Sequence, residues 1–221
     1  KQNVMDFCTI ATAGNATDFG NLAAANSTCT SSSSNTRSIT MGGHENAGRT
    51  DRCQYVTIAN TGNTTDFGNL TEVLAEITSC SSPTRAFAFS RQSGGSNQIE
   101  FITIATTGNG TDFGNMTVSV ETPGALSSNT RGIHAGGSGD VNNIGYITMA
   151  SAGNAADFGA LTVGRNSIAG TSNVIRGIMC GRAVIDYITI ASTGNATDFG
   201  DPLLDATNKQ ACSSAHGGLA A

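Results

Sequence analysis

The chain has 221 residues, only 12% of them charged, and its formal net charge is −5. This charge pattern argues against nucleic-acid binding, which requires a basic footprint. No apolar run approaches the roughly 18 residues needed to span a bilayer, so we expect no membrane insertion. The chain begins at Lys1 rather than at Met, which is typical of a processed or excised segment.

Taken in chain order, the sequence repeats one unit five times. Each unit holds a Gly-rich stretch, a variable segment, an apolar run, a motif close to TGNxTDFG and a short polar return. The motif supplies one Asp per unit: Asp18, Asp66, Asp112, Asp157 and Asp198. A step of nineteen residues from the first four reaches Arg37, Arg85, Arg131 and Arg176, and a step of eighteen from the fifth reaches His216.

The apolar runs predict β-strands. They are rich in Ile, Val, Thr and aromatic residues and are bounded by Gly and Asn. One run places Ile99 and Phe101 on one face and Ile102 on the other, so we expect cover on both faces. Two aromatic columns should pack between units: Phe7, Tyr55, Phe101, Tyr146 and Tyr187, and Phe19, Phe67, Phe113, Phe158 and Phe199.

The chain ends favour a closed ring over a stack. Residues 1–20 begin in the middle of a unit, and the missing Gly-rich piece recurs at 215–221. A stack would leave two incomplete units exposed, whereas a ring leaves no open edge. We therefore predict an all-β, single-domain, five-bladed β-propeller in which the C-terminal strand completes the N-terminal blade. The approximate blades are 1–36 with 215–221, 37–84, 85–130, 131–175 and 176–214.

Two resemblances accompany this prediction. The order Gly42-Gly43, Tyr55, Phe67 resembles a kelch-type blade, with Phe67 where such blades usually carry Trp. The longer string, TRGxxxGG followed by IxYITIASTGNATDFGxLT, is similar over essentially the whole chain to repeat proteins of tailed bacteriophages, especially marine ones. The resemblance implies a kelch-like repeat protein of a virion, on a tail fibre or elsewhere on the particle surface, made in the host cytoplasm.

The repeated Asp and Arg columns each allow two interpretations. The Asp can accept backbone N–H groups in an Asx-type turn, or the Asn/Asp turn can bind calcium; we favour the structural role. DFG is also the magnesium-binding triplet of protein kinases, but the other kinase loops are missing here and the triplet occurs five times. We therefore exclude a kinase site. The Arg column can form a cationic ring for an anionic ligand or bond to a carboxylate or carbonyl within the protein. Its constant spacing favours the second interpretation, and His216 interrupts the column.

The cysteines and histidines give no sign of a metal site or cofactor. His44, His134 and His216 lack metal-ligand spacing. We predict that the six cysteines are free, buried thiols, with Cys8 and Cys53 in core positions.

Length variation concentrates between the Gly-rich stretch and the apolar run. The variable segments are 44–52, 91–97, 138–143 and 181–183. Because binding residues commonly lie on loops held by a rigid scaffold, we predict ligand contacts here, with solvated surface loops as the alternative. The candidates are His44, Glu45, Arg49, Asp51, Arg52, Arg91, Gln92, Asn97, Asp140, Asn142 and Arg182.

These features predict a non-enzymatic binding or structural module that recognises a host-surface glycan or another virion protein. Five similar shallow sites would give avidity. One alternative is a protein–protein assembly scaffold that forms homo-oligomers through a propeller face. A glycan-cleaving enzyme is less favoured, since it needs two carboxylates about 5 to 9.5 Å apart.

Overall fold

The computed structural model describes residues 1–89, 97–205 and 210–212. These residues form nineteen β-strands in five antiparallel sheets and no helix, which confirms the all-β prediction. It follows that the described chain contains no helix long and apolar enough to cross a membrane.

The sheets follow one another in chain order. The first sheet holds β1 (Gln2–Phe7) and β2 (Thr17–Asn26). The second holds β3 (Thr30–Ser33), β4 (Arg37–Met41), β5 (His44–Glu45), β6 (Gly48–Thr57) and β7 (Thr65–Leu74). The third holds β8 (Thr78–Ser81), β9 (Arg85–Phe89), β10 (Gln98–Thr103) and β11 (Thr111–Asn115). The fourth holds β12 (Gly124–Ser127), β13 (Arg131–Ala135), β14 (Asn143–Thr148) and β15 (Ala156–Ala160), and the fifth β16 (Ala169–Ser172), β17 (Arg176–Gly181), β18 (Val184–Thr189) and β19 (Thr197–Gly200).

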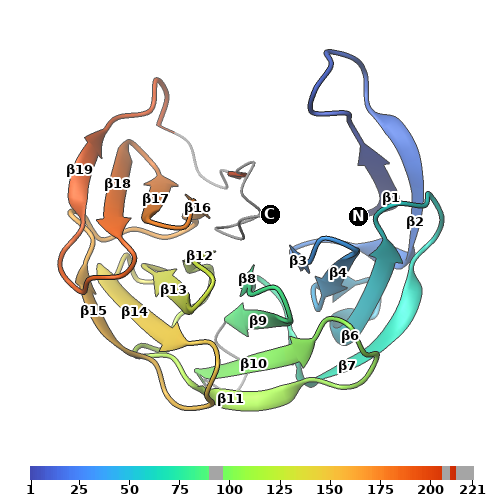
Figure 1. Cartoon of the computed structure of the whole chain (residues 1–221), viewed down its shortest axis with the longest axis horizontal. Coiled ribbons are helices and arrows are strands. Elements are labelled where there is room, and N and C mark those ends of the chain that lie inside the picture. The colour runs from blue at the N-terminus through green and yellow to red at the C-terminus, as the bar shows by residue number, and fades with distance from the viewer. Residues whose placement is uncertain (90–96, 206–209, 213–221) are drawn as a thin grey trace.

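Figure 1 shows the sheets arranged around a common centre. The short strands β3, β8, β12 and β16 lie nearest the centre, and β7, β11, β15 and β19 lie outermost. At the top of the view the arc is open between β19 and the first sheet. The predicted closing strand, 215–221, lies outside the described residues.

The second to fifth sheets each begin one strand earlier than the approximate repeat boundaries. The inner strands are Ser-, Thr- and Gly-rich segments that, in the sequence-based boundaries, fall at the end of the preceding unit. They pair instead with the strand that begins at the next Arg; in the fourth sheet, for example, Ser127 lies opposite Gly132. A short polar segment carries no apolar alternation, so its partner is not evident from pattern alone.

The DFG triplet forms a β-bulge in every copy. In the third sheet Glu100 pairs with Asp112 and Ile99 pairs with Gly114, so Phe113 is the extra residue. The Asp112 carboxylate accepts a hydrogen bond from the Gly114 backbone N–H at 3.0 Å, and Gly114 has φ +143°. The bulge explains why Asp and Gly flank this Phe, because the backbone needs a positive φ and a local acceptor there.

The hydrophobic core lies between neighbouring sheets. One cluster joins Phe67 of the second sheet to Ile102 and Ile104 of the third, and the third and fourth sheets meet around Phe113 in the same way. Phe67, Phe113 and Phe158 are only 2–3% exposed, so the expectation that this aromatic column packs between units is confirmed for these three. Phe199, on the outer strand of the fifth sheet, is 52% exposed.

The six cysteines are free, but they are not all buried. Cys53 and Cys80 are buried, and desolvation raises the pKa of Cys53 to about 12 with a further contribution from the Glu100 carboxylate. Cys8 is exposed, contrary to the prediction of a core position. Its counterpart Ile102 is covered by the preceding sheet, and no described sheet precedes the first one.

Candidate functional site

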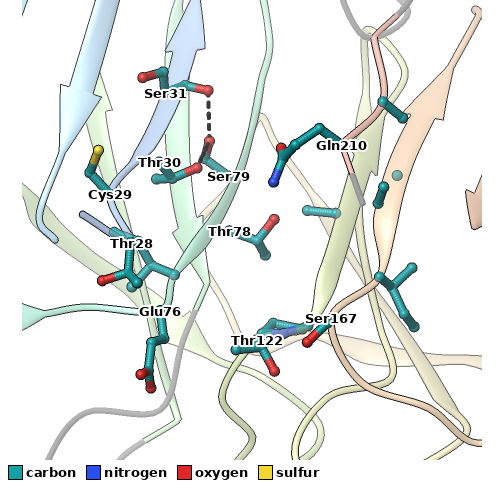
Figure 2. Close-up of a pocket in the computed structure, with 17 residues that line it drawn as sticks. Thr28, Cys29, Thr30, Ser31, Glu76, Thr78, Ser79, Thr122, Ser167 and Gln210 are labelled. Atoms are coloured by element: carbon teal, nitrogen blue, oxygen red, sulfur yellow. Dashed lines mark hydrogen bonds between the residues drawn. The ribbon is translucent and has the colours of Figure 1, made fainter. Parts of the chain in front are cut away.

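A cavity of about 790 Å³ lies among the innermost strands (Figure 2). A second space of about 320 Å³ shares part of its lining and runs deeper between the same strands. In Figure 2, Thr78 and Gln210 point into the cavity, while Glu76, Thr122 and Ser167 lie toward one end of it. Seven of the seventeen lining residues are Ser or Thr, and most of the others are small or apolar.

Five segments contribute equivalent repeat positions to this lining. One column of the repeat supplies Ser31, Ser79, Ala125, Gly170 and Ala211, and the next supplies Ser32, Cys80, Leu126, Thr171 and Cys212. Residues 210–212 therefore line the same spaces as the four inner strands, at equivalent positions of the repeat. The centre of the molecule is built from all five repeats.

The rim of the cavity carries a repeated backbone conformation. Its residues Thr28, Glu76, Thr122 and Ser167 have φ between 52° and 59°, which is the left-handed region. The Glu76 N–H donates to the Thr28 carbonyl, and the Thr122 N–H donates to the Glu76 carbonyl, both at 3.1 Å. Because a non-glycine residue costs about 1–2 kcal/mol in this region, four equivalent cases indicate a conformation imposed by the junction between sheets.

Two sets of hydroxyls line the cavity and the adjoining second space, and they differ in their partners. The Ser79 hydroxyl donates to the Ser31 carbonyl at 3.0 Å, and the Ser172 hydroxyl donates to the Ser127 carbonyl at 2.6 Å, so these groups hold neighbouring inner strands together. Within the described chain, the hydroxyls of Thr78, Thr122 and Ser167 show no hydrogen bond to the protein. The second set is available to a ligand.

Charge at the rim is localised on one cluster. Glu76 is the one carboxylate among the described lining residues. Arg49 lies 3.9 Å from the Glu76 carboxylate and 3.7 Å from that of Glu121. Arg49 therefore joins the variable segment of the second sheet to the cavity rim.

The first variable segment is not a loop, which corrects the sequence-based expectation. His44–Glu45 pairs with Gly48–Arg49 as a hairpin, and Asp51 and Arg52 continue in β6. Asn46 and Ala47 supply a two-residue turn, and Gly48 follows it at φ +128°. The Arg52 guanidinium binds the Glu45 carboxylate at 2.9 Å, so these two candidates stiffen the hairpin.

The remaining candidates also make contacts within the protein. Asp140 binds the Arg182 guanidinium at 3.0 Å and accepts a hydrogen bond from the Asn166 amide at 2.9 Å. The Asn97 side-chain amide donates to the Met116 carbonyl, and the Asn142 carbonyl accepts the Leu161 N–H at 2.7 Å. Arg91 and Gln92 lie outside the described residues.

The hairpin and the cavity rim lie on one face of the molecule. Thr30, at the start of β3, pairs with Met41, just before His44, and the rim residue Thr28 precedes Thr30 by two positions. The sequence-based candidates of segment 44–52 thus lie on the same face as the rim, but none of them lines the cavity. In the sequence, the rim is marked only by a polar residue two positions before each inner strand. None of these four residues is Gly or Asn, the residue types that usually indicate a positive φ.

The Arg column makes within-protein bonds, one of the two arrangements considered from the sequence. Arg37 Nη1 donates to the carbonyls of Ile104 and Ala105, at 3.0 and 2.9 Å, in the next sheet. Arg85 and Arg131 repeat this contact with the sheet that follows each of them. Each of the four Arg side chains also lies over the ring of its own sheet's aromatic residue, at 4.5–4.7 Å. His216 lies outside the described residues.

A second group of polar residues is buried between sheets. Glu100 is fully buried, accepts the Thr71 N–H at 2.7 Å, and has its pKa raised by desolvation. Asp186 is paired with the buried Arg165 at 2.9 Å. His134 fills the space above Gly145, and burial lowers the pKa of its imidazole to about 4. These groups are closed to a ligand and serve packing between sheets.

No three His, Cys, Asp or Glu side chains of the described residues gather in a way that could hold a metal ion. No protein-family model and no curated protein matches the chain.

Proposed function

We propose that the chain is a closed, five-bladed, kelch-like β-propeller that acts as a non-enzymatic binding module, and that it takes a host-surface glycan into the axial cavity. The observation that carries this proposal is the cavity of about 790 Å³ to which all five repeats contribute equivalent positions. Its volume lies within the range of small-molecule sites, roughly 300–1,000 Å³.

The chemistry of the lining favours a hydroxyl-rich ligand. The hydroxyls of Thr78, Thr122 and Ser167 can each donate and accept, and the Gln210 amide adds both functions. Sugar hydroxyls have the same dual character. A strongly charged ligand would find only one carboxylate, Glu76, already near Arg49.

Binding is favoured over cleavage by the same lining. Glycoside hydrolysis requires two carboxylates about 5 to 9.5 Å apart across the scissile bond. Glu76 provides one, and Glu121 is engaged with Arg49. We therefore propose recognition without turnover, to be checked by assaying host polysaccharide for shortened products.

The proposed setting is the surface of a phage particle, as part of a tail fibre or a decoration protein. This part of the proposal rests on the similarity of the repeat to tailed-phage repeat proteins. It directs the choice of ligands toward bacterial surface polysaccharides.

A glycan array followed by titration calorimetry tests the binding proposal. Thr78→Val removes a lining hydroxyl while retaining the side-chain shape, and we expect it to weaken the selected glycan about tenfold, the effect of losing one hydrogen bond of about 1.4 kcal/mol. Thr193→Val is the matched control, because Thr193 is exposed on the opposite face. Absence of binding to any glycan, or equal affinity in the two variants, would contradict the proposal.

An assembly scaffold is the second candidate function. Val174 and Ile175 are 44% and 64% exposed at the turn before β17, on the face opposite the cavity rim. In the second and fourth sheets the equivalent positions are both polar, Asn followed by Thr. Light scattering separates the two functions: self-association lost in Ile175→Ser supports the scaffold, and a strict monomer at high concentration rejects it.

A further inference from the structure

The TGNxTDFG motif binds to a copy of itself in the neighbouring sheet. The GN part of one copy docks on the DFG bulge of the preceding copy. At the junction of the second and third sheets, the Gly108 N–H donates to the Phe67 carbonyl at 2.8 Å and the Gly110 N–H donates to the Asn69 carbonyl at 2.7 Å. The Asn109 side-chain oxygen accepts the Asn69 N–H at 3.1 Å.

Four such joints are present in the described chain. The Gly-to-Phe bond is 2.7 or 2.8 Å in each, and the Asn side chain accepts a backbone N–H at 3.0–3.1 Å in each. The Gly of the bulge is required for close approach, because a Cβ atom at Gly20, Gly68, Gly114 or Gly159 would overlap the partner glycine's carbonyl oxygen. The four joints are thus one interface used repeatedly.

In the described chain, one copy of the donor segment and one copy of the acceptor segment of this interface have no partner. Gly14, Asn15 and Ala16 occupy the donor positions in the first sheet, and Phe199 to Asp201 occupy the acceptor positions in the fifth. A Cβ atom at Gly200 would meet nothing within 4 Å, unlike its four counterparts. Ile10 is 93% exposed, whereas its counterparts Ile104, Met149 and Ile190 are at most 2% exposed; the fourth counterpart, Ile58, which faces the two-stranded first sheet, is 42% exposed.

The last member of the Arg column likewise lacks a partner that the other three have. Arg37, Arg85 and Arg131 each donate to the carbonyl of the residue equivalent to Ile10 in the next sheet. Arg176 is exposed and lies over the Tyr187 ring at 4.5 Å, but among the described residues it has no carbonyl partner equivalent to those of the other three. Its guanidinium therefore has the same stacking as the other three and lacks their second contact.

We propose that residues 10–16 dock on Phe199–Asp201 of the same chain, as a fifth copy of this joint. The Gly14 N–H then donates to the Phe199 carbonyl, the Ala16 N–H to the Asp201 carbonyl, the Asp201 N–H to the Asn15 side chain, and Arg176 to the Ile10 carbonyl. The inference rests on the proposed closed ring. This contact between residues 10–16 and Phe199–Asp201 would close the ring at its outer edge. It is separate from the closing strand predicted at 215–221.

Two observations favour the same chain over a second copy. Both unused halves border the one opening in the arc of sheets (Figure 1). Residues 210–212 already stand in the fifth place around the axial cavity, so the centre of the ring is arranged for five repeats. A single closure uses both halves and leaves neither available to another molecule.

Cross-linking with an internal control tests the joint. Asn15→Cys with Asp201→Cys replaces the predicted pair, and Asn63→Cys with Asn21→Cys replaces an observed pair in which the Asn21 N–H donates to Asn63 at 3.0 Å. Both variants carry Cys8→Ser and Cys212→Ser, since those thiols are exposed. After mild oxidation we expect both pairs to form a disulfide within one chain, detected by mass and by a linked tryptic peptide. A disulfide between two chains, or linkage of the internal pair alone, would overturn the proposal.

Thermal unfolding gives a second readout that needs no disulfide geometry. If the joint forms, we expect Gly200→Ala to lower the melting temperature by at least ~5 °C through overlap with the docked turn, the same effect that we predict for Gly114→Ala. Gly48→Ala is the control, because Gly48 has a similar φ, +128°, and open space around it. A shift no larger than that of Gly48→Ala would overturn the joint. Glycan binding is measured separately, so an intact cross-link without binding would reject only the proposed function.

Discussion

Arg85 shows how a single side chain joins two sheets. Its guanidinium lies 4.7 Å from the centre of the Phe101 ring in its own sheet and donates to the Met149 carbonyl at 3.0 Å in the next. The residue is half-buried, so both contacts are only partly screened by solvent. The constant Asp-to-Arg spacing predicted a within-protein bond, but it could not show that the acceptor is a carbonyl 64 residues away in the neighbouring sheet.

We expect Arg85→Ala to destabilise the fold by about 2–3 kcal/mol, since it removes a charge-assisted hydrogen bond and a cation–π contact. Urea unfolding measures the loss. Arg182→Ala is the control, because its ion pair with Asp140 is exposed and such pairs contribute at most about 1 kcal/mol. Equal losses in the two variants would contradict the proposed role of the Arg column.

The pH dependence of stability should report His134. Burial lowers the pKa of this imidazole to about 4 from an ordinary 6.5, so on acidification the unfolded chain binds the proton first. The contribution of neutral His134 to the free energy of unfolding is complete above about pH 6.5. It is lost as the pH falls toward 4, by roughly 3 kcal/mol at most. Glu100 acts in the opposite sense, because burial raises its pKa and the folded chain takes up the proton first.

His134→Met should therefore flatten the stability profile between pH 6.5 and 4. Met is the residue at the equivalent position of the fifth sheet, Met179, where it is buried. Urea unfolding at half-unit pH steps makes the comparison. A profile unchanged from that of the wild-type chain would show that another group causes the acid sensitivity.

At the scale of the element, the DFG bulge connects local sequence to long-range structure. The extra residue of the bulge, Phe113, places its side chain in the core between the third and fourth sheets, and its carbonyl accepts the Gly153 N–H at 2.7 Å. The sequence alone indicated a turn built around Asp. The bulge, and the docking of one motif copy on another, depend on strand register, which the repeat does not reveal.

Gly114→Ala should break this joint. We expect a loss of about 2–4 kcal/mol, because the new methyl group overlaps the Gly153 carbonyl oxygen and the backbone is held at φ +143°. Gly48→Ala should cost only about 1 kcal/mol, since it has the conformational strain without the overlap. Chemical denaturation of the two variants side by side would refute the joint if their losses were equal.

The variable segments and inner strands show what sequence reasoning could reach at this scale. Segment 44–52 was recognised by its length and charge but folds as a hairpin, because Asn46-Ala47 makes a turn that the composition did not mark. The inner strands β3 and β8 escaped notice because they are short and polar. Their positions around the axis, rather than any chemical motif, make Thr78 and Glu76 candidate ligand contacts.

At the scale of the whole molecule, five copies of one unit create a site that no copy contains alone. Four repeats each contribute a rim position and an inner strand, residues 210–212 add a fifth lining segment, and only their arrangement around a common centre encloses a cavity. The five repeats predicted this architecture, whereas the cavity lining depends on which face each short strand turns inward. The proposed ligand follows from the hydroxyls that the arrangement leaves free of protein partners.

The most direct test is a crystal structure of the chain soaked with the glycan that binds best on the array. The proposal predicts sugar density in the axial cavity, in contact with Thr78, Thr122 and Ser167, inside a ring of five sheets. Density only on the outer faces of the sheets, or an empty cavity at saturating glycan, would contradict it.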